Sequence, residues 1–192
     1  MTGSLRERNK AAAIEQVRDV AFTLMYRHGF DAVTVEQIAA ATSVSPSTVY
    51  RYFGTKEALV LSTERPIQLV ERLARDESDR TALAAFERAA NKVWNGDDAL
   101  AAEVSLVVAN PALVERFERQ LLDQRPAVAE LFARRRGKKT PGTKDEALAA
   151  AAIAVLATAV LGWQRAGGVK PLDKLLAKSF EAIALAERVT PA

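Results

Sequence analysis

Two short hydroxyl side chains, Ser47 and Thr48, and the guanidinium of Arg51 stand close together in the sequence, and all three can form hydrogen bonds. Their spacing places them on one face of a helix. A helix that enters the DNA major groove needs short side chains near its start, where its backbone approaches the base edges, and a guanidinium that reaches guanine or phosphate. From Thr42 through Lys56 the only charged side chains are Arg51 and Lys56, so no carboxylate there repels phosphate. These residues predict contact with DNA.

Two short helices must hold that face in place. The first begins at Thr34 with the T-x-x-Q spacing of a capping box. The second begins at Ser45, directly before Pro46, and ends at Gly54, since serine caps, proline starts and glycine stops helices. A turn is expected at residues 42–44. Two short helices joined by a turn of about three residues make a helix-turn-helix.

The second helix is expected to have a packing face as well. Val49 and Phe53 are four residues apart, so they lie on the same side of the helix and can pack on Ile38 and Ala39 of the first. Ser47, Thr48 and Arg51 then face outward.

The order of these residues resembles the TetR-type transcriptional regulators of bacteria, over about residues 10–60. The matching residues are Gly29, Phe30, Thr34, Val35, Ile38, Ala39, Val44, Ser45, Tyr50, Phe53, Lys56, Glu57 and Leu59. The chain departs from the pattern in the turn, where Thr42 and Ser43 replace alanine and glycine. A left-handed backbone there costs serine about 1 kcal/mol more than glycine.

The resemblance implies separate roles within the DNA-binding surface. It implies phosphate contacts from Thr34, Tyr50, Tyr52 and Lys56, and base contacts from Ser47 and Thr48, with Arg51 as a further candidate for base contact. Pro46 would approach the bases through apolar contact, and Ser45 is included among the DNA-binding residues. Alternatively, Tyr50 and Tyr52 pack in the small helical core and Lys56 is an ordinary solvated lysine.

Composition bounds the rest of the molecule. The 192 residues are 49% hydrophobic and 27% charged, which suits one or two globular domains. We expect a flexible arm at 1–10, a DNA-binding domain at 11–60, and a ligand-binding and dimerisation domain at 61–192. Without cysteine there is no disulfide or thiolate metal site, and without an apolar segment at the N-terminus no secretion signal is expected; both fit the bacterial cytoplasm.

Helical periodicity continues through the whole chain, so an all-α fold of about nine helices is predicted. A helix at about 9–28 precedes the helix-turn-helix, and its last residue, His28, is expected to stabilise the C-terminal end of this helix. The later helices are expected at about 56–78, with a kink or break at Pro66 that makes this residue a candidate hinge, and at 80–94, 98–109, 111–135 with an internal Pro126, 143–166 and 172–188.

The alanine-rich helix from about Thr143 to Ala166 is apolar nearly all round. It falls short of about 20 strongly apolar residues, so no membrane span is expected. Burial on both sides is expected instead, against its own bundle and across a subunit interface. In the resembled family the last two helices form a four-helix homodimer interface, and a dimer reads a palindrome in two half-sites.

Apolar side chains of the middle helices either line a ligand cavity or simply pack in the core. They are Phe86, Trp94, Val104, Leu106, Phe117, Leu121 and Trp163. Residues 110–137 resemble the C-terminal domain of the mycofactocin-type subgroup, whose members include acyl-CoA responders. This implies an acyl pocket with Arg125 or the run 134–136 near the phosphates.

The basic character of the chain is concentrated in one loop. The net charge is +3, and six of the cations are Arg134, Arg135, Arg136, Lys138, Lys139 and Lys144. Without these six, 21 basic residues stand against 24 acidic ones. The loop is interpreted either as a solvated, partly disordered linker or as a site for an anionic ligand.

The predicted function is a sequence-specific DNA-binding transcriptional regulator, a repressor that a small apolar or acyl-type ligand, such as an acyl-CoA or another lipophile, releases from a palindromic operator. The alternative is a helix-turn-helix activator or architectural DNA binder without a ligand. An enzyme is not expected, because one histidine and no cysteine give no convergent acid/base set. No cofactor and no metal are expected.

Overall fold

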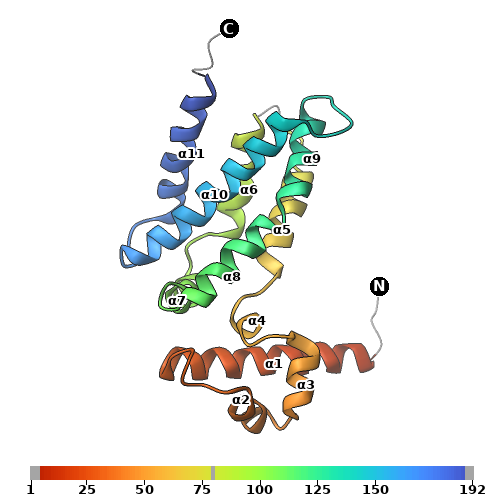
Figure 1. Ribbon diagram of the computed structural model, residues 1–192, viewed down its shortest axis with the longest axis vertical. Helices are drawn as coiled ribbons and strands as arrows, with labels where there is room; N and C mark the ends of the chain where they lie inside the picture. The colour runs from red at the N-terminus through yellow and green to blue at the C-terminus, as the bar shows by residue number, and fades with distance from the viewer. Residues whose placement is uncertain (1–4, 79–80, 189–192) are drawn as a thin grey trace. The chain divides into compact units, whose positions relative to one another are not determined.

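The computed structural model describes residues 5–78 and 81–188, and the chain divides into two compact units, Met1–Ser62 and Thr63–Ala192. Throughout these described residues every regular element is an α-helix, which confirms the all-α prediction (Figure 1). Eleven helices are present there instead of about nine. Each unit is described by itself.

The first unit contains four helices: α1 (Leu5–His28), α2 (Val35–Thr42), α3 (Pro46–Phe53) and α4 (Glu57–Val60). Helix α2 packs against α1 and α3, and α1 also packs against α4. Ala21, Met25, Ile38 and Leu59 are completely buried between them. Helix α1 begins earlier than the predicted residue 9, so 5–10 of the predicted flexible arm are helical; the remainder of that arm, 1–4, lies outside the described residues.

The predicted kink or break does not fall at Pro66. The helix breaks earlier, where Leu61 ends α4 in an extended conformation (φ −89°, ψ 107°), and α5 (Glu64–Ala74) then begins anew. Pro66 is the third residue of α5, and in a first turn proline removes no intrahelical hydrogen bond. Pro66 is therefore not a hinge.

Pro126 likewise starts a helix and does not interrupt one. It is the second residue of α9 (Arg125–Arg135), which follows α8 (Pro111–Leu122) after a two-residue break. The breaks before Pro66 and Pro126 account for the two helices beyond the predicted nine.

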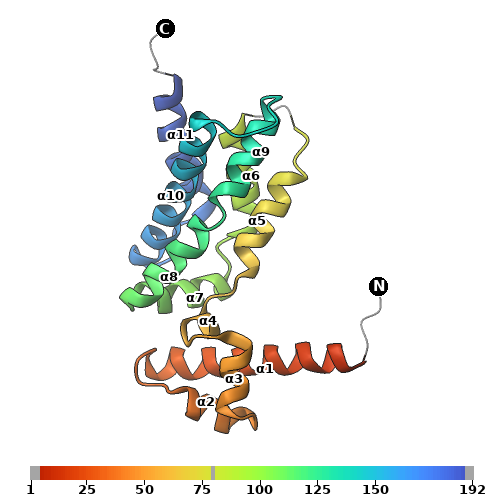
Figure 2. The same cartoon turned by 45° about the vertical axis from the view of Figure 1, so that its right-hand side comes forward.

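The second unit is built around one long helix. It contains α5, α6 (Ala82–Val93), α7 (Asp98–Val108), α8, α9, α10 (Thr143–Arg165) and α11 (Leu172–Arg188). Helix α10 packs against α6, α7, α8, α9 and α11. Figures 1 and 2 both show it running between α9 and α11.

The apolar character of α10 is explained by this central place. At 23 residues, and with a mean hydropathy of 1.8 over its most apolar 18-residue window, α10 is by length and composition long and apolar enough to cross a membrane. Half of its most apolar window is buried inside the protein, which supports a core helix. Val160 is fully buried within its own chain, so its burial requires no second subunit.

Candidate DNA-binding surface

The start of α3 brings three hydroxyl groups together. Ser45 is the N-cap, and its side chain accepts a hydrogen bond from the Thr48 amide at 3.2 Å. The Ser45 Oγ also lies 2.9 Å from the Ser47 Oγ and 2.8 Å from the Thr48 Oγ1. Ser45, Pro46 and Ser47 are exposed, and Thr48 is half-buried. These hydroxyls can donate or accept, so they can contact a base edge or a phosphate oxygen.

The turn before α3 has the left-handed backbone geometry that costs serine more than glycine. Ser43 ends α2 with φ 57° and ψ 27°, and within the described residues it is the only non-glycine residue with positive φ. The Val44 amide donates to the Ala39 carbonyl at 3.2 Å, and the Thr42 hydroxyl donates to the Ile38 carbonyl at 2.8 Å. These bonds close the end of α2 and set the entry into α3.

Helix α3 has one packed face and one open face. Val49 is 2% exposed and lies on the side that packs against α2, whereas Ser47 and Arg51 are exposed. At the start of α2 the capping box is present, because Gln37 and Thr34 exchange side-chain hydrogen bonds with each other's backbone amides at 3.2 and 2.9 Å. The backbone and side chain of Thr34 are therefore fixed at an exposed helix start.

The aromatic and cationic residues lie at the edges of this face. Tyr50 is 49% exposed, so it is not a core residue, whereas Tyr52 is half-buried. The Arg51 guanidinium lies 5.1 Å from the Tyr52 ring centre, and the Lys10 ammonium of α1 lies 5.4 Å from it. Lys56 is also more than a freely solvated lysine, since its ammonium stands 4.3 Å from the Phe30 ring centre.

Lys10 is a residue that sequence reasoning placed only in a flexible arm. Because α1 begins at Leu5, Lys10 is held on a helix beside Tyr52. It adds a third cation to the two on and after α3. The only sequence signal was that Arg6, Arg8 and Lys10 make the first ten residues basic, without any indication of which residue Lys10 would meet.

The residues predicted for a ligand site lie mainly in the core of the second unit. Phe86, Trp94, Val104, Leu106, Phe117, Leu121 and Trp163 are all buried, and Arg125 is exposed. Phe86 fits the core-packing alternative, because its ring centre lies 6.2 Å from that of Phe132 and 5.7 Å from that of Phe180. Trp163 lines a cavity of about 510 Å³ between α10 and α11.

Trp94 of the predicted ligand set, and Gln120 outside that set, each have a buried side-chain nitrogen that could donate a hydrogen bond. Trp94 is 1% exposed and Gln120 is 7% exposed, and neither the Trp94 Nε1 nor the Gln120 Nε2 has a hydrogen-bond partner within the described part of the chain. Buried donors are nearly always paired, so these two nitrogens depart from the usual pattern of a protein core.

The basic segment 134–144 runs from the end of α9 to the start of α10, and two arginines at its start are tied to other parts of the unit. Arg135 donates to the backbone carbonyls of Asp76 and Ser78, and Arg136 pairs with the fully buried Asp145. The Gly142 amide and then Arg136 lower the pKa of the Asp145 carboxyl. Arg135 and Arg136 thus hold their own chain together, whereas Arg134, Lys138, Lys139 and Lys144 are exposed.

Comparison with known proteins gives matches to both units. Residues 17–63 match the profile of bacterial regulatory proteins of the tetR family, and residues 77–187 match the MftR C-terminal domain. The chain is 26% identical over 184 residues to a putative mycofactocin biosynthesis transcriptional regulator, MftR, of Mycobacterium tuberculosis, covering 92% of this chain and 91% of that protein.

Solved structures share the fold. Thermus thermophilus FadR, a TetR family repressor in complex with lauroyl-CoA, has a TM-score of 0.65 at 20% identity, covering 93% of this chain and 97% of that one. Bacillus subtilis FadR in complex with stearoyl-CoA has a TM-score of 0.59 at 22% identity, covering 87% and 95%. With the helix-turn-helix and the two matching domains in place, this chain belongs to the TetR family of bacterial transcriptional regulators and has a C-terminal domain of the MftR type.

Proposed function

We propose that this regulator is a repressor that binds a palindromic operator as a homodimer and is released by a small acyl-type ligand. The exposed start of α3 carries the proposal, because three clustered hydroxyls and Arg51 stand on one open face behind a buried Val49. In this proposal Ser47, Thr48 and Arg51 read bases. Thr34, Tyr50, Tyr52 and Lys56 hold phosphates, while Ser45 and Pro46 lie at the base edges.

A homodimer is supported by the exposed side of α10. Five small or polar residues at helical spacing leave that side without large side chains: Ala147, Ala151, Ala154, Thr158 and Gly162. Small side chains allow a second helix to approach closely. The 510 Å³ cavity beside Thr158 and Gly162, shared with α11, would be filled by the partner. Two copies would then place two α3 helices on successive half-sites about 34 Å apart or a multiple of it.

An acyl-type ligand is supported by the unpaired donors in the second unit. The Trp94 and Gln120 nitrogens can donate to a carbonyl oxygen, and the surrounding apolar side chains suit an acyl chain. Both FadR structures were solved with acyl-CoA, which supports the same ligand class for this chain. A ligand would lower operator affinity by favouring a conformation of the bundle that binds DNA less well.

A second candidate is a DNA binder whose core takes no ligand. The ring contacts of Phe86 with Phe132 and Phe180 favour it, because they fill the space beside one predicted ligand residue. Catalysis is not proposed for either candidate, and the bacterial cytoplasm is the proposed site of action.

The deciding experiment selects bound fragments from random DNA with the full chain, with and without acyl-CoAs of several lengths. A repressor of the proposed kind enriches an inverted repeat, and an acyl-CoA reduces the enrichment. Enrichment of a repeat that no ligand changes, together with no ligand-induced rise in melting temperature, would favour the ligand-free candidate. Failure to enrich any inverted repeat would contradict the dimeric reading.

A further inference from the structure

A basic cavity lies between the C-terminal end of α5 and helix α6. It has a volume of about 300 Å³, and its lining includes Arg72, Arg75, Arg88 and Lys92 together with Asp76 and Glu77. A second cavity of about 310 Å³ adjoins it through Arg88 and Lys92. All four cationic residues are exposed to solvent. Neither DNA contacts by α3 nor the core ligand residues involve this place.

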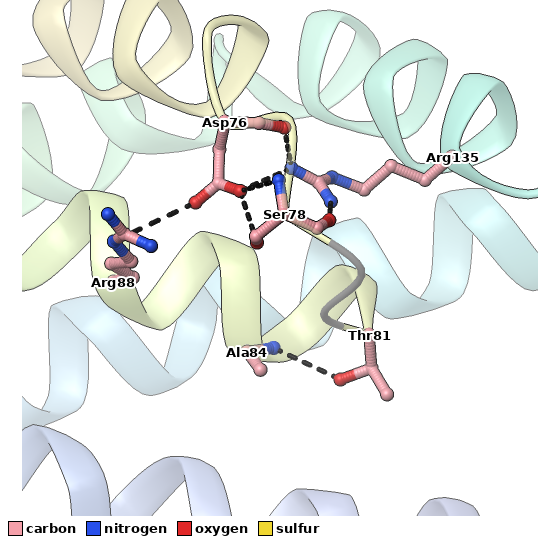
Figure 3. Close-up of polar contacts among 6 residues, drawn as sticks. All are labelled: Asp76, Ser78, Thr81, Ala84, Arg88 and Arg135. Carbon is pink, nitrogen blue, oxygen red and sulfur yellow. Dashed lines mark hydrogen bonds and ion pairs between the residues drawn. The ribbon is translucent and has the colours of Figure 1, made fainter.

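The acidic residue in the floor of the cavity is already neutralised. Asp76 Oδ1 lies 3.0 Å from Arg135 of α9, and the side chain of Asp76 is only 9% exposed (Figure 3). The hydroxyl and the amide of Ser78 also donate to this carboxylate. The hydrogen bond from the Ser78 side chain is the largest cause that lowers the pKa of Asp76 to about 2, so the carboxylate stays ionised and committed to these partners.

The cations of the cavity are left with weak partners. Arg88 comes no closer than 4.0 Å to Asp76 and is 56% exposed, as Figure 3 shows at the left of the cluster. Arg75 pairs with Glu71 at 3.5 Å, but both side chains are more than half exposed, and such pairs contribute little. With Asp76 offset by Arg135, the first cavity holds four cations against Glu77, and in the second cavity Glu87 stands beside Arg88 and Lys92.

We propose that this cavity binds the phosphate groups of a small phosphorylated molecule. Guanidinium groups match the geometry of phosphate oxygens by donating two parallel hydrogen bonds, and three arginines converge here with one lysine. The concave form favours a small molecule over a nucleic acid backbone, which a long stripe of cations would follow. Two adjoining cavities that share Arg88 and Lys92 have room for more than one phosphate.

The position of the cavity gives binding a regulatory consequence, and in this respect the inference rests on the proposed function. Helix α5 directly follows the break at 61–63, after the DNA-binding unit ends. A phosphate held by Arg72 of α5 and by Arg88 of α6 would fix these two helices to each other. The ligand would thereby favour one arrangement of the bundle.

The test measures binding of coenzyme A to the full chain by calorimetry, with pantetheine as the matched probe that lacks phosphates. We expect coenzyme A to bind and pantetheine not to bind. The double variant Arg88→Gln/Lys92→Gln should weaken coenzyme A binding by at least tenfold. Arg119→Gln/Arg165→Gln removes the same charge from exposed positions outside the cavity and should leave binding unchanged. Thermal melts of both variants should match the wild type, because all four positions are exposed.

Several results would overturn the proposal. One is equal binding of pantetheine and coenzyme A, and another is unchanged coenzyme A binding by the cavity variant. A third is a cavity variant that loses non-specific DNA affinity while coenzyme A fails to bind the wild type, since the cations would then serve a nucleic acid backbone. Operator binding by the ligand-free wild type is measured in parallel. If the ligand-free wild type did not bind an operator, the proposed function would be contradicted, whereas the conclusion on phosphate binding in the cavity would be unaffected.

Discussion

The two units of this protein place their predicted functional residues in opposite environments. In the first unit most of the predicted DNA-binding residues lie exposed on short helices whose ends are fixed by neighbours a few positions away, such as Ser45 for α3. In the second unit the predicted ligand residues, apart from Arg125, are buried among helices far apart in the sequence. The contrast shows that local signals locate an exposed surface well, whereas they cannot tell a ligand cavity from a core.

The largest expected effect compares a buried and an exposed position on α10. Val160 is fully buried, so Val160→Glu places an unpaired carboxyl in the core and should lower the free energy of unfolding by about 4 kcal/mol or more. Ala154 is exposed on the same helix. Ala154→Glu should leave the fold intact but give monomers if this face joins two copies. Thermal melts and light scattering measure the two outcomes.

Either of two results would break this comparison. A folded, stable Val160→Glu protein would mean that α10 is packed more loosely than its burial indicates. A dimeric Ala154→Glu protein that still binds a palindrome would place the subunit interface elsewhere.

The next largest effect concerns the cluster around Asp76, which joins α5 to α9. Asp76→Asn removes the charge that pairs with Arg135 and leaves Ser78 a neutral amide oxygen in place of a carboxylate, and it should cost about 1–3 kcal/mol of unfolding free energy. The folded-state pKa of Asp76 is lowered from 3.8 to about 2, so the carboxylate stabilises the fold above pH 3.8. That stabilisation is lost as the pH falls through about 2.

Denaturant titrations of the wild type and Asp76→Asn between pH 6 and pH 2 test this dependence. The difference in unfolding free energy should be constant at the upper end and narrow as the pH approaches 2. Glu77→Gln, which changes the neighbouring exposed carboxylate, serves as the control. If the difference in unfolding free energy stayed constant down to pH 2, the stabilisation that Asp76 provides would not depend on its charge.

The same contrast explains which parts of the structure the sequence predicts. Thr34, Ser45 and Pro46 act on backbone groups within three residues, so the ends of α2 and α3 were predicted correctly. Leu61 and Pro126 show where local reasoning failed, because it placed each proline inside one long helix, whereas each lies in the first turn of a new helix. A proline signal alone does not distinguish these two cases.

Contacts between distant residues had no signal in a single sequence. Arg135 bonds to backbone carbonyls 57 and 59 residues earlier, and it appeared in the sequence only as one member of a basic run. The alanine-rich helix was expected to be buried both by its own bundle and by a second subunit, and Val160 is already fully buried by helices of its own unit. Such contacts have no local signal because packing depends on the whole chain, whereas caps depend on a few residues.

A smaller effect is expected at the edge of the DNA-binding surface. Lys56→Ala should weaken binding to all DNA sequences alike, and the slope of log affinity against log salt should fall by about 0.9 for each bound copy. Lys56→Arg should keep the slope, since the charge remains. Binding to operator and random DNA over a range of salt concentrations measures both. A slope that is unchanged in the alanine variant would mean that Lys56 only packs on Phe30.

The smallest effect is local to the turn between α2 and α3. Ser43 adopts φ 57°, which glycine reaches without steric cost, so Ser43→Gly should raise the free energy of unfolding by about 0.5–1 kcal/mol. Ser45, two residues later, caps α3, and Ser45→Ala should lower it by about 1 kcal/mol. Urea titrations of both variants measure these opposite signs. If Ser43→Gly were destabilising, the serine side chain would be stabilising the turn by more than its backbone strain costs, and local backbone preference would not account for this turn.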